Sequence, residues 1–590
     1  MIFLVLILLL FSLLIKTSYF FLSDYWSDIA FKVVHLSFAG FIIELAITFF
    51  IFLLLYSITR RKYTSVAITL ILYFLFITSQ IVKVNLLGTP IFPADLNLIG
   101  DLLRTKEVYI IFLPTLIGFI FFISITIFLG FRKEKSSLLI LAPILLIISF
   151  TLFSAAYFFN EDTRLLLRNH GIFYKKNANL TKKALQNGLL TGFVQAALFT
   201  GELKPPENYS KELIEEIIQK YKLNKSSSAN PRYDNVIVML VESYSDPEEF
   251  GWRYSEPILP NYKKITNSQI SGLAMSPVYG GKSINAEFEL MTGMSNRFTP
   301  IETTPYQEFI DRDIPSLART FQESGYTTNA IQMVPFRGFG FEKIYDYLGV
   351  ENQISLSPQS PTIEKDPSGR SVSSKVIGNE VISILKSQTK SFVFLFPNSS
   401  HSPWKMSHYP NSQLKLLNIN IDSNYADTII AYTEALNHID EMLGSIMNHV
   451  KKTNEKTLIV IAGDHLPGFD FYLNNKNINS QNNYINYILN KYRTSLAIWS
   501  SDEPLPYEKI NISLNLIPAV IFKYSDIETK GFMKFNSILY NSFDVISHVF
   551  KEKNKAFSKV LKDNHKLLIN DYLLLQYDLL FGNQYISTNE

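Results

Sequence analysis

The chain has 590 residues, more than a single hydrophobic core usually holds, so at least two domains are expected. A formal net charge of +3 gives no support for binding nucleic acid through overall charge. The sequence has no cysteine, which excludes disulfides, thiolate metal ligands and cysteine nucleophiles and leaves the redox compartment undecided. Hydrophobic residues make up 47% of the chain and are concentrated near its N-terminus, which indicates a membrane segment.

Five apolar stretches near the N-terminus are long enough to cross a bilayer. They cover roughly residues 2–22, 38–57, 65–87, 108–131 and 137–158. The first has no preceding basic residue and no small-residue cleavage site, so we interpret it as a retained helix rather than a signal peptide. Glu44 lies inside the second stretch, where a carboxylate needs a partner.

The distribution of basic residues predicts the orientation of these stretches. Arg60-Arg61-Lys62 follows the second stretch and Arg132-Lys133-Lys135 the fourth, so both loops are expected in the cytoplasm. The sequence therefore predicts a five-helix transmembrane domain over residues 1–158, in the cytoplasmic (inner) membrane. Everything after about residue 158 is expected to be extracytoplasmic.

Residues 159–232 are predicted to form an interfacial helical linker. Residues 180–199 carry apolar side chains at a helical period, with lysines near their start, as a helix at a membrane surface would. A second short amphipathic helix is predicted at 211–221. The serine run at 226–228 predicts a flexible joint and a domain boundary near residue 232.

From residue 233 to about 545 the pattern is that of an α/β domain. Apolar runs rich in β-branched residues predict buried strands at 235–242, 324–333, 391–398, 457–464 and 494–501. Helical patterns lie between them, the longest at 424–450. This alternation predicts a mainly parallel sheet, whose ligands bind beyond the carboxyl ends of the strands. Residues 546–590 are expected to form a C-terminal helical tail.

Candidate metal ligands follow two of the predicted strands. Glu242 closes the first, and Asp464 and His465 close the strand at 457–464. A helix cap or a surface charge would explain each residue alone, but a buried strand that runs into an acid and an imidazole favours a metal or substrate site. Oxygen ligands with one nitrogen suit Mn²⁺ or Mg²⁺, and Zn²⁺ also accepts them. We therefore expect one divalent metal, with Mn²⁺ as the first choice.

The stretch from Met275 to Met294 supplies a candidate nucleophile. Ser283 lies between a glycine pair and an apolar-acidic run that predicts the start of a helix. A divalent ion bound by the three ligands and by Ser283 would lower the pKa of this hydroxyl and make it a nucleophile for phosphoryl transfer. A surface loop followed by a core helix is the structural alternative.

Three further residues are predicted to bind the substrate. His401, which follows the third predicted strand, could bind phosphate oxygens or protonate a leaving group. Lys282 would offset phosphate charge, and Arg337 is the candidate for a two-point phosphate contact. A solvated lysine and a surface arginine are the alternatives for the last two.

The order of these motifs resembles the lipoteichoic acid synthase family. The motifs are a five-span anchor, an interfacial linker, LVESYSD, GGKSINAEFELMTG, HSPW and AGDH. Members of this family are membrane-bound phosphoglycerol transferases with a sulfatase-like extracellular domain of the alkaline phosphatase superfamily. The resemblance therefore implies a sulfatase-like fold for residues 233–545.

The resemblance also assigns roles to residues. It implies metal binding by Glu242, Asp464 and His465 and substrate binding by His401, and it puts Ser283 where the family has a nucleophilic threonine. The family's Trp-x-Arg substrate motif has no match: Phe339 and Phe341 stand at those positions, and Arg337 would have to act from a shifted one.

The reaction that the resemblance implies has two steps. Ser283 attacks the phosphate of an anionic lipid, expected to be phosphatidylglycerol, and an extracytoplasmic glycan or polymer then accepts the phosphoglycerol group. Two alternatives stay open: a phosphoethanolamine transferase of the same superfamily, and a non-catalytic relative that binds lipid. A true sulfatase activity is disfavoured, because the residues after Ser283 lack the proline and arginine of the sulfatase nucleophile motif.

Overall fold

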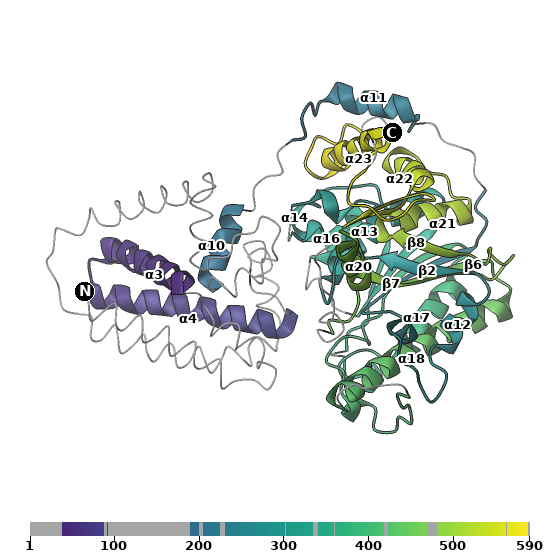
Figure 1. Ribbon diagram of the computed structural model, residues 1–590, viewed down its shortest axis with the longest axis horizontal. Helices are drawn as coiled ribbons and strands as arrows, with labels where there is room; N and C mark the ends of the chain where they lie inside the picture. The colour runs from purple at the N-terminus through teal and green to yellow at the C-terminus, as the bar shows by residue number, and fades with distance from the viewer. Residues whose placement is uncertain are drawn as a thin grey trace. The chain divides into compact units, whose positions relative to one another are not determined.

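The fold is taken from a computed structural model of the chain. It describes residues 38–87, 91, 189–199, 205–224, 230–300, 303–333, 340–358, 360–417, 423–469, 481–561 and 563–587. The chain divides into two compact units, residues 1–202 and 203–590. Figure 1 shows the elements of both units, and each unit is treated by itself below.

The described part of the first unit consists of three helices. These are α3 (Phe38–Thr59), α4 (Lys62–Leu87) and α10 (Leu189–Phe199). Helices α3 and α4 pack together, and α10 contacts both, with the rings of Phe76 and Phe193 edge to face at 5.3 Å. The Glu44 carboxylate is buried and accepts a hydrogen bond from the N–H of Leu190 at 3.3 Å. The acid inside the second apolar stretch thus binds the N-terminal end of α10.

The predicted membrane spans fall only partly within the described residues. The stretches at 38–57 and 65–87 coincide with α3 and α4, and the other three lie outside the described residues. Within the part of the chain that the structure describes, no helix is long and apolar enough to cross a membrane. The five-helix transmembrane domain therefore stays a prediction.

An eight-stranded sheet forms the centre of the second unit. Its strands are β1 (Asn235–Val241), β2 (Ile270–Met275), β3 (Thr327–Gln332), β4 (Asn352–Ser355), β5 (Ser391–Phe396), β6 (Thr457–Gly463), β7 (Arg493–Ser500) and β8 (Lys509–Ser513). The spatial order is β4-β3-β5-β1-β6-β7-β2-β8. Strand β7 pairs antiparallel with both neighbours, and all other pairs in the sheet are parallel. The predicted mainly parallel sheet is confirmed.

Helices cover both faces of this sheet (Figure 1). Along β1, Val236, Val238 and Leu240 face one hydrophobic core, and Ile237 and Met239 face the other. The first core packs under α13 (Ser283–Thr292), α15 (Leu317–Glu323), α21 (Ile517–Ser525), α22 (Gly531–Ser542) and α23 (Asp563–Leu580). The second packs under α12 (Pro260–Thr266), α17 (Ser374–Ser387) and α18 (Ser423–Thr453). A sheet buried on both faces explains why its central strands are continuous apolar runs.

The remaining elements lie around this core. They are α11 (Lys211–Tyr221), α14 (Pro305–Glu308), α16 (Phe341–Tyr347), α20 (Gln481–Tyr492) and the hairpin of β9 (Phe543–Ile546) and β10 (Phe550–Glu552). Helix α11 was expected in the linker, but it packs on α23: Ile214, Ile217 and Ile218 are buried in the first core. The C-terminal region contains α23, as the expected helical tail would, together with β10.

Candidate active site

The candidate site begins at two neighbouring strand ends. Strands β1 and β6 pair in parallel with Val241 opposite Gly463, so the next residues, Glu242 and Asp464, emerge side by side at the carboxyl edge of the sheet. A side chain at Gly463 has no room, because a Cβ there would lie 2.0 Å from the carbonyl oxygen of Tyr244. The segment after β1 can therefore pass directly over the end of β6, and it carries Glu242 close to Asp464.

Backbone groups hold the Asp464 carboxylate in place. Its Oδ1 accepts hydrogen bonds from the N–H of Ser243 at 2.7 Å and of His465 at 2.6 Å. His465 is oriented from its other side, because Nδ1–H donates to the carbonyl of Leu466 at 2.9 Å. In a neutral imidazole with its hydrogen on Nδ1, Nε2 carries a free lone pair. A histidine needs this tautomer to bind a metal through Nε2.

Ser283 is the first residue of helix α13, at the same edge of the sheet. The loop before it approaches the segment after His465: Gly280 N–H donates to the carbonyl of Leu466 at 3.2 Å, and a Cβ on Gly280 would lie 3.2 Å from Gly468. Gly280 has a φ of +65°, so it is also in a conformation that favours glycine. The expected helix is confirmed, and it starts at the serine.

The four predicted groups converge. Ser283 Oγ lies 3.1 Å from Glu242 Oε2, to which it donates, and 3.4 Å from His465 Nε2. His465 Nε2 lies 3.5 Å from Glu242 Oε1 and 3.3 Å from Asp464 Oδ2. One ligand atom from each of Glu242, Asp464 and His465 lies within 4.8 Å of the others, and all three residues are buried.

Three ionisable side chains, Glu242, Asp464 and His465, lie close together and shift one another's pKa values. Burial and the nearby carboxylate of Glu242 raise the pKa of Asp464. Burial also pushes the pKa of Glu242 upward, but the imidazoles of His465 and His401, together with hydrogen bonds from Ser243 and Ser283, hold that pKa below its usual value. Burial would lower the pKa of His465, and the two carboxylates overcome this and raise it. Two buried acids against one imidazole are an environment that a bound cation would stabilise.

The donor set fits a divalent metal. Asp464 Oδ2 is buried and accepts no hydrogen bond from the described residues, although it faces His465 Nε2. Carboxylate oxygens, a serine oxygen and one imidazole nitrogen are ligands that Mn²⁺, Mg²⁺ and Zn²⁺ accept. Glu242, Ser283, Asp464 and His465 are therefore the residues that could hold the metal.

The structure places two of the three predicted substrate-binding residues, and the third lies outside the described residues. His401 follows β5, is exposed, and lies close enough to Glu242 to lower its pKa. Lys282 directly precedes Ser283, is half-buried, and has a φ of +65°. Arg337 lies outside the described residues.

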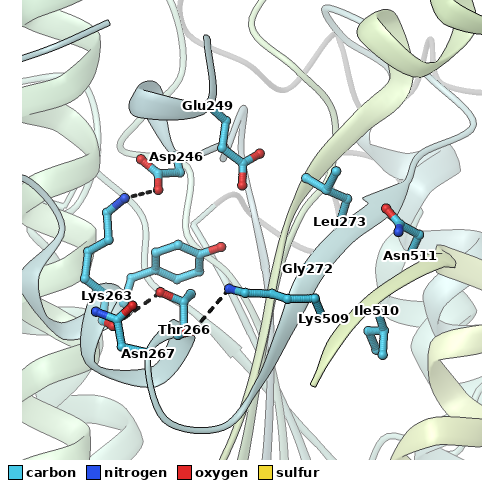
Figure 2. A pocket seen from close by; sticks show the side chains of 11 residues that line it. Asp246, Glu249, Lys263, Thr266, Asn267, Gly272, Leu273, Lys509, Ile510 and Asn511 are labelled. Atoms are coloured by element: carbon cyan, nitrogen blue, oxygen red, sulfur yellow. Dashed lines mark hydrogen bonds and ion pairs between the residues drawn. The ribbon is translucent and has the colours of Figure 1, made fainter. Parts of the chain in front are cut away.

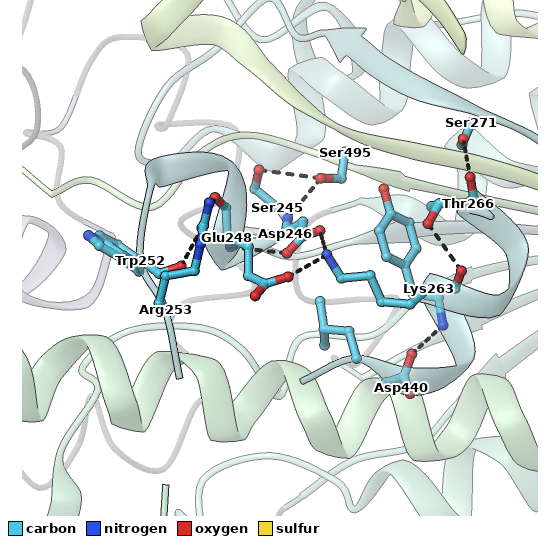
Figure 3. Close-up of polar contacts among 12 residues, drawn as sticks. Ser245, Asp246, Glu248, Trp252, Arg253, Lys263, Thr266, Ser271, Asp440 and Ser495 are labelled. Atoms are coloured by element: carbon cyan, nitrogen blue, oxygen red, sulfur yellow. Dashed lines mark hydrogen bonds and ion pairs between the residues drawn. The ribbon is translucent and has the colours of Figure 1, made fainter. Parts of the chain in front are cut away.

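Polar contacts behind Glu242 fix the segment that carries it. Figure 3 shows Asp246, whose backbone N–H bonds Ser495 Oγ at 2.8 Å and whose carboxylate pairs with Lys263. The Tyr432 hydroxyl donates to the carbonyl of Ser243 at 2.7 Å. These contacts come from β7, α12 and α18, so three elements hold the turn that follows Glu242.

A pocket of about 380 Å³ lies elsewhere, against the first residues of β8 and the middle of β2. Figure 2 shows Glu249, Lys263 and Lys509 among the side chains that line it. None of the four clustered residues lines this pocket. The carboxyl edge of the sheet, rather than this pocket, is therefore the place where the candidate chemistry gathers.

Two buried groups near the site were not predicted from the sequence. Glu287, one turn after Ser283 on α13, accepts hydrogen bonds from the Tyr345 hydroxyl at 2.7 Å and from Gln332 at 3.3 Å. Ser400 Oγ donates to the carbonyl of Glu242 and so fixes the loop that carries His401 to the segment that carries Glu242. The acidic residue inside an apolar run is a sequence signal that could have indicated the first; nothing in the sequence marks the second.

Comparison with known proteins identifies the fold of this unit. Residues 234–523 match the sulfatase family, and the match contains every clustered residue. The match covers 290 of the 590 residues, just under half of the chain, and it relates this domain to the sulfatase family.

This domain is similar to a solved phosphoglycerol transferase and to a solved lipoteichoic acid synthase. The phosphoglycerol transferase GacH of Streptococcus pyogenes, solved with sn-glycerol-1-phosphate, matches with 25% identity and a TM-score of 0.52, over 66% of this chain and 98% of that one. The lipoteichoic acid synthase LtaP of Listeria monocytogenes matches with 17% identity and a TM-score of 0.45, over 63% of this chain and 98% of that one. The predicted resemblance to this sulfatase-like group is confirmed.

A curated relative is also similar in sequence. A protein of Rhizobium meliloti (strain 1021), named for a proposed role in cyclic beta-1,2-glucan modification, is 26% identical over 369 residues. The match covers 60% of this chain and 55% of that protein, so the chain spans about half the length of this relative.

Proposed function

We propose that the protein is a metal-dependent transferase that moves a phosphoglycerol group from phosphatidylglycerol to an extracytoplasmic acceptor. The observation that carries the proposal is the position of Ser283 Oγ, 3.1 Å from Glu242 and 3.4 Å from His465 at a helix N-terminus. A hydroxyl at the centre of a buried ligand set is suited to nucleophilic attack on phosphorus.

The proposed reaction passes through a phosphoserine ester. A bond forms between Ser283 Oγ and the lipid phosphorus, the bond from phosphorus to the diacylglycerol oxygen breaks, and the serine proton is lost to solvent. His401 is the proposed proton donor to the leaving oxygen. An acceptor hydroxyl then attacks the phosphorus of the phosphoserine and loses its proton to solvent. The bond from phosphorus to Ser283 Oγ breaks, and Ser283 Oγ takes up a proton as it leaves.

Glu242, Ser283, Asp464 and His465 are the proposed metal ligands, with Mn²⁺ as the first choice. When bound, the cation would lower the pKa of the Ser283 hydroxyl and offset charge on the phosphate oxygens. The chain's own contribution is to orient His465 through Leu466 and Asp464 through Ser243.

The membrane anchor belongs to the same proposal. Five spans over residues 1–158 and a linker over 159–232 would hold residues 233–545 near the headgroups of the outer leaflet. The catalytic domain would then be extracytoplasmic, where the lipid headgroup and a glycan acceptor are both available. The name of the Rhizobium relative supports a glycan as the acceptor class.

The test compares two donor lipids. Full-length protein is incubated with Mn²⁺ and vesicles that contain headgroup-labelled phosphatidylglycerol or phosphatidylethanolamine, and released diacylglycerol is measured. We expect release from phosphatidylglycerol by the native protein and none by Ser283→Ala, whose fold should be intact because the hydroxyl is only half-buried.

Each other outcome has a definite meaning. Release from phosphatidylethanolamine alone would contradict the phosphoglycerol assignment and favour the phosphoethanolamine alternative. Full activity in Ser283→Ala would contradict the proposed nucleophile, and vesicle binding without any release would favour the non-catalytic alternative.

A further inference from the structure

Arg370 lies in a turn whose backbone is held by one buried acid. Asp366 Oδ1 accepts hydrogen bonds from the N–H groups of Arg370 at 3.2 Å and of Ser371 at 3.1 Å. Lys365 and Val372 form an isolated bridge across the base of the turn. The turn ends directly before helix α17, so the point from which the arginine side chain projects is fixed.

The guanidinium of Arg370 reaches the loop that carries His401. Its NH1 donates to the carbonyl oxygen of Ser402 at 3.0 Å, and His401 Nδ1 contacts the same oxygen at 2.7 Å. Both nitrogen atoms contact the carbonyl oxygen of Ser402, so they lie close to each other. The guanidinium and the imidazole are therefore neighbours at the surface.

This pair lies beside the candidate metal cluster. Ser400 Oγ donates to the carbonyl of Glu242, and Trp404 Nε1 donates to the carbonyl of Ser400 at 2.8 Å, so the loop is fixed to the segment that carries Glu242. His401 directly follows Ser400, the residue that makes this contact with Glu242. A group bound between Arg370 and His401 would therefore approach the rim of the cluster.

Within the described part of the chain, no acidic side chain balances the charge of Arg370. Its guanidinium forms no ion pair with a carboxylate of these residues, and the side chain is exposed. Asp366, the acid of the same turn, is buried, and Ser368 Oγ and backbone N–H groups already occupy its oxygens. A guanidinium has five N–H donors in a planar fork that matches two phosphate oxygens. Arg370 uses one of them on the residues that the structure describes.

We propose that Arg370 is a specificity-determining residue that binds the non-bridging oxygens of the phosphate that Ser283 attacks. This inference rests on the proposed function for the identity of the donor. It assigns the arginine contact expected of Arg337 to a different loop, next to His401. The contact orients the phosphate and selects an anionic donor, while metal binding stays with the four clustered residues.

The test uses full-length protein with three substitutions. Arg370→Gln removes the charge, and Arg370→Lys keeps the charge without the two-point geometry. Arg253→Gln is the matched control, because Arg253 is also exposed and its NH1 also donates to backbone carbonyls, those of Glu248 and Trp252 (Figure 3). Each protein is loaded with Mn²⁺, and its metal content is measured first.

Two readouts separate the phosphate contact from catalysis. Calorimetry measures the Kd of glycerol phosphate and of inorganic phosphate, and vesicle assays measure KM and kcat for phosphatidylglycerol. In Arg370→Gln we expect both the Kd of glycerol phosphate and the KM to rise about tenfold or more, with a smaller change in kcat and unchanged metal content. Arg370→Lys should recover part of the loss, and Arg253→Gln should match the native protein.

The outcomes also separate this inference from the proposed function. If native protein turns over phosphatidylglycerol and Arg370→Gln has native Kd and KM, the role of Arg370 is wrong and the proposed function stands. If native protein has no turnover, the proposed function is wrong, and the glycerol phosphate Kd still decides whether Arg370 binds phosphate. If Arg370→Gln raises the Kd of inorganic phosphate but keeps the native KM for phosphatidylglycerol, Arg370 does not contact the phosphate of the donor lipid, and the inference is wrong.

Discussion

At the residue scale, the site depends on two buried carboxylates that lie against one imidazole. Asp464 has no exposed surface and has one oxygen without a hydrogen bond from the described residues. Without a cation, this arrangement costs free energy, because two neighbouring acids cannot both stay ionised at low cost away from water. The metal-free cluster should therefore lower the free energy of unfolding of the protein. Metal binding at the cluster should raise that free energy.

Replacing Asp464 by Asn should separate these two effects. In chelator, Asp464→Asn is expected to be more stable than the native protein by about 1–3 kcal/mol, since one buried charge is gone while the amide oxygen can still accept from Ser243 and His465. Adding Mn²⁺ should raise the melting temperature of the native protein and leave that of the variant unchanged. Thermal unfolding with and without metal measures both.

The control for this substitution removes a buried acid outside the cluster. Asp440 accepts hydrogen bonds from the backbone N–H groups of Asn261 and Tyr262 on α12. Asp440→Asn should keep the metal-induced shift. A metal-induced shift in Asp464→Asn equal to the native one would rule out Asp464 as a ligand.

At the element scale, the central strands and their ends could be predicted from the sequence. Residues 235–241, 391–396 and 457–463 lie in the buried centre of the sheet, so their apolar runs are long, and the first polar residue after each run marks the carboxyl edge. This is why Glu242, Asp464 and His465 could be grouped before the structure was known.

Other elements gave no comparable signal. Strand β2 contains Ser271 and Gly272, β4 is four residues long with exposed ends, and β8 pairs on one side only. Short, partly polar strands lack the periodicity that identifies a strand. Contacts such as Ser400 with Glu242, or Arg370 with Ser402, join residues far apart in sequence, so only the fold reveals them.

Helix α13 is tied to its neighbours through Glu287, and this contact predicts a pH dependence. Burial raises the pKa of Glu287 to about 7, although Tyr345 and Gln332 donate to it. An acid whose pKa is higher in the folded state holds a proton that the unfolded chain has lost, so its stabilisation is full below the unfolded pKa, about 4.5, and is lost as pH rises through about 7.

The Glu287→Gln substitution should remove this pH dependence. Relative to the native protein, the variant is expected to gain about 1–3 kcal/mol of unfolding free energy between pH 5 and pH 8. Urea unfolding of metal-free protein at the two pH values gives the difference. Parallel changes in the two proteins would show that Glu287 is not the titrating group.

At the scale of the whole molecule, the division between the units lies at residues 202 and 203. The sequence indicated a boundary near residue 232, which would leave α11 outside the catalytic domain. In the structure, Lys220 pairs with Asp571 of α23 at 2.7 Å, and the rings of Tyr221 and Phe535 lie edge to face at 4.9 Å. Amphipathic character alone does not say which surface a helix covers, so this assignment needed the fold.

Two truncated chains test the role of α11. Residues 203–590 should fold alone and bind metal, whereas residues 233–590 lose three buried isoleucines and expose apolar surface of α23. We expect the shorter chain to be less stable by several kcal/mol, because each buried isoleucine contributes about 1.5–3 kcal/mol. Equal unfolding free energies for the two chains would show that α11 belongs to the linker after all.

The central claim is that Ser283 Oγ becomes covalently bonded to the phosphorus of a phosphoglycerol group when a divalent metal is bound. The most direct measurement is mass spectrometry of the peptide that contains Ser283, after full-length protein is incubated with phosphatidylglycerol vesicles and Mn²⁺ and the reaction is quenched. The account predicts that this peptide gains the mass of a phosphoglycerol group on Ser283, and that the gain disappears in chelator and in His465→Gln. An unmodified Ser283 peptide, in protein that is releasing diacylglycerol, would contradict it.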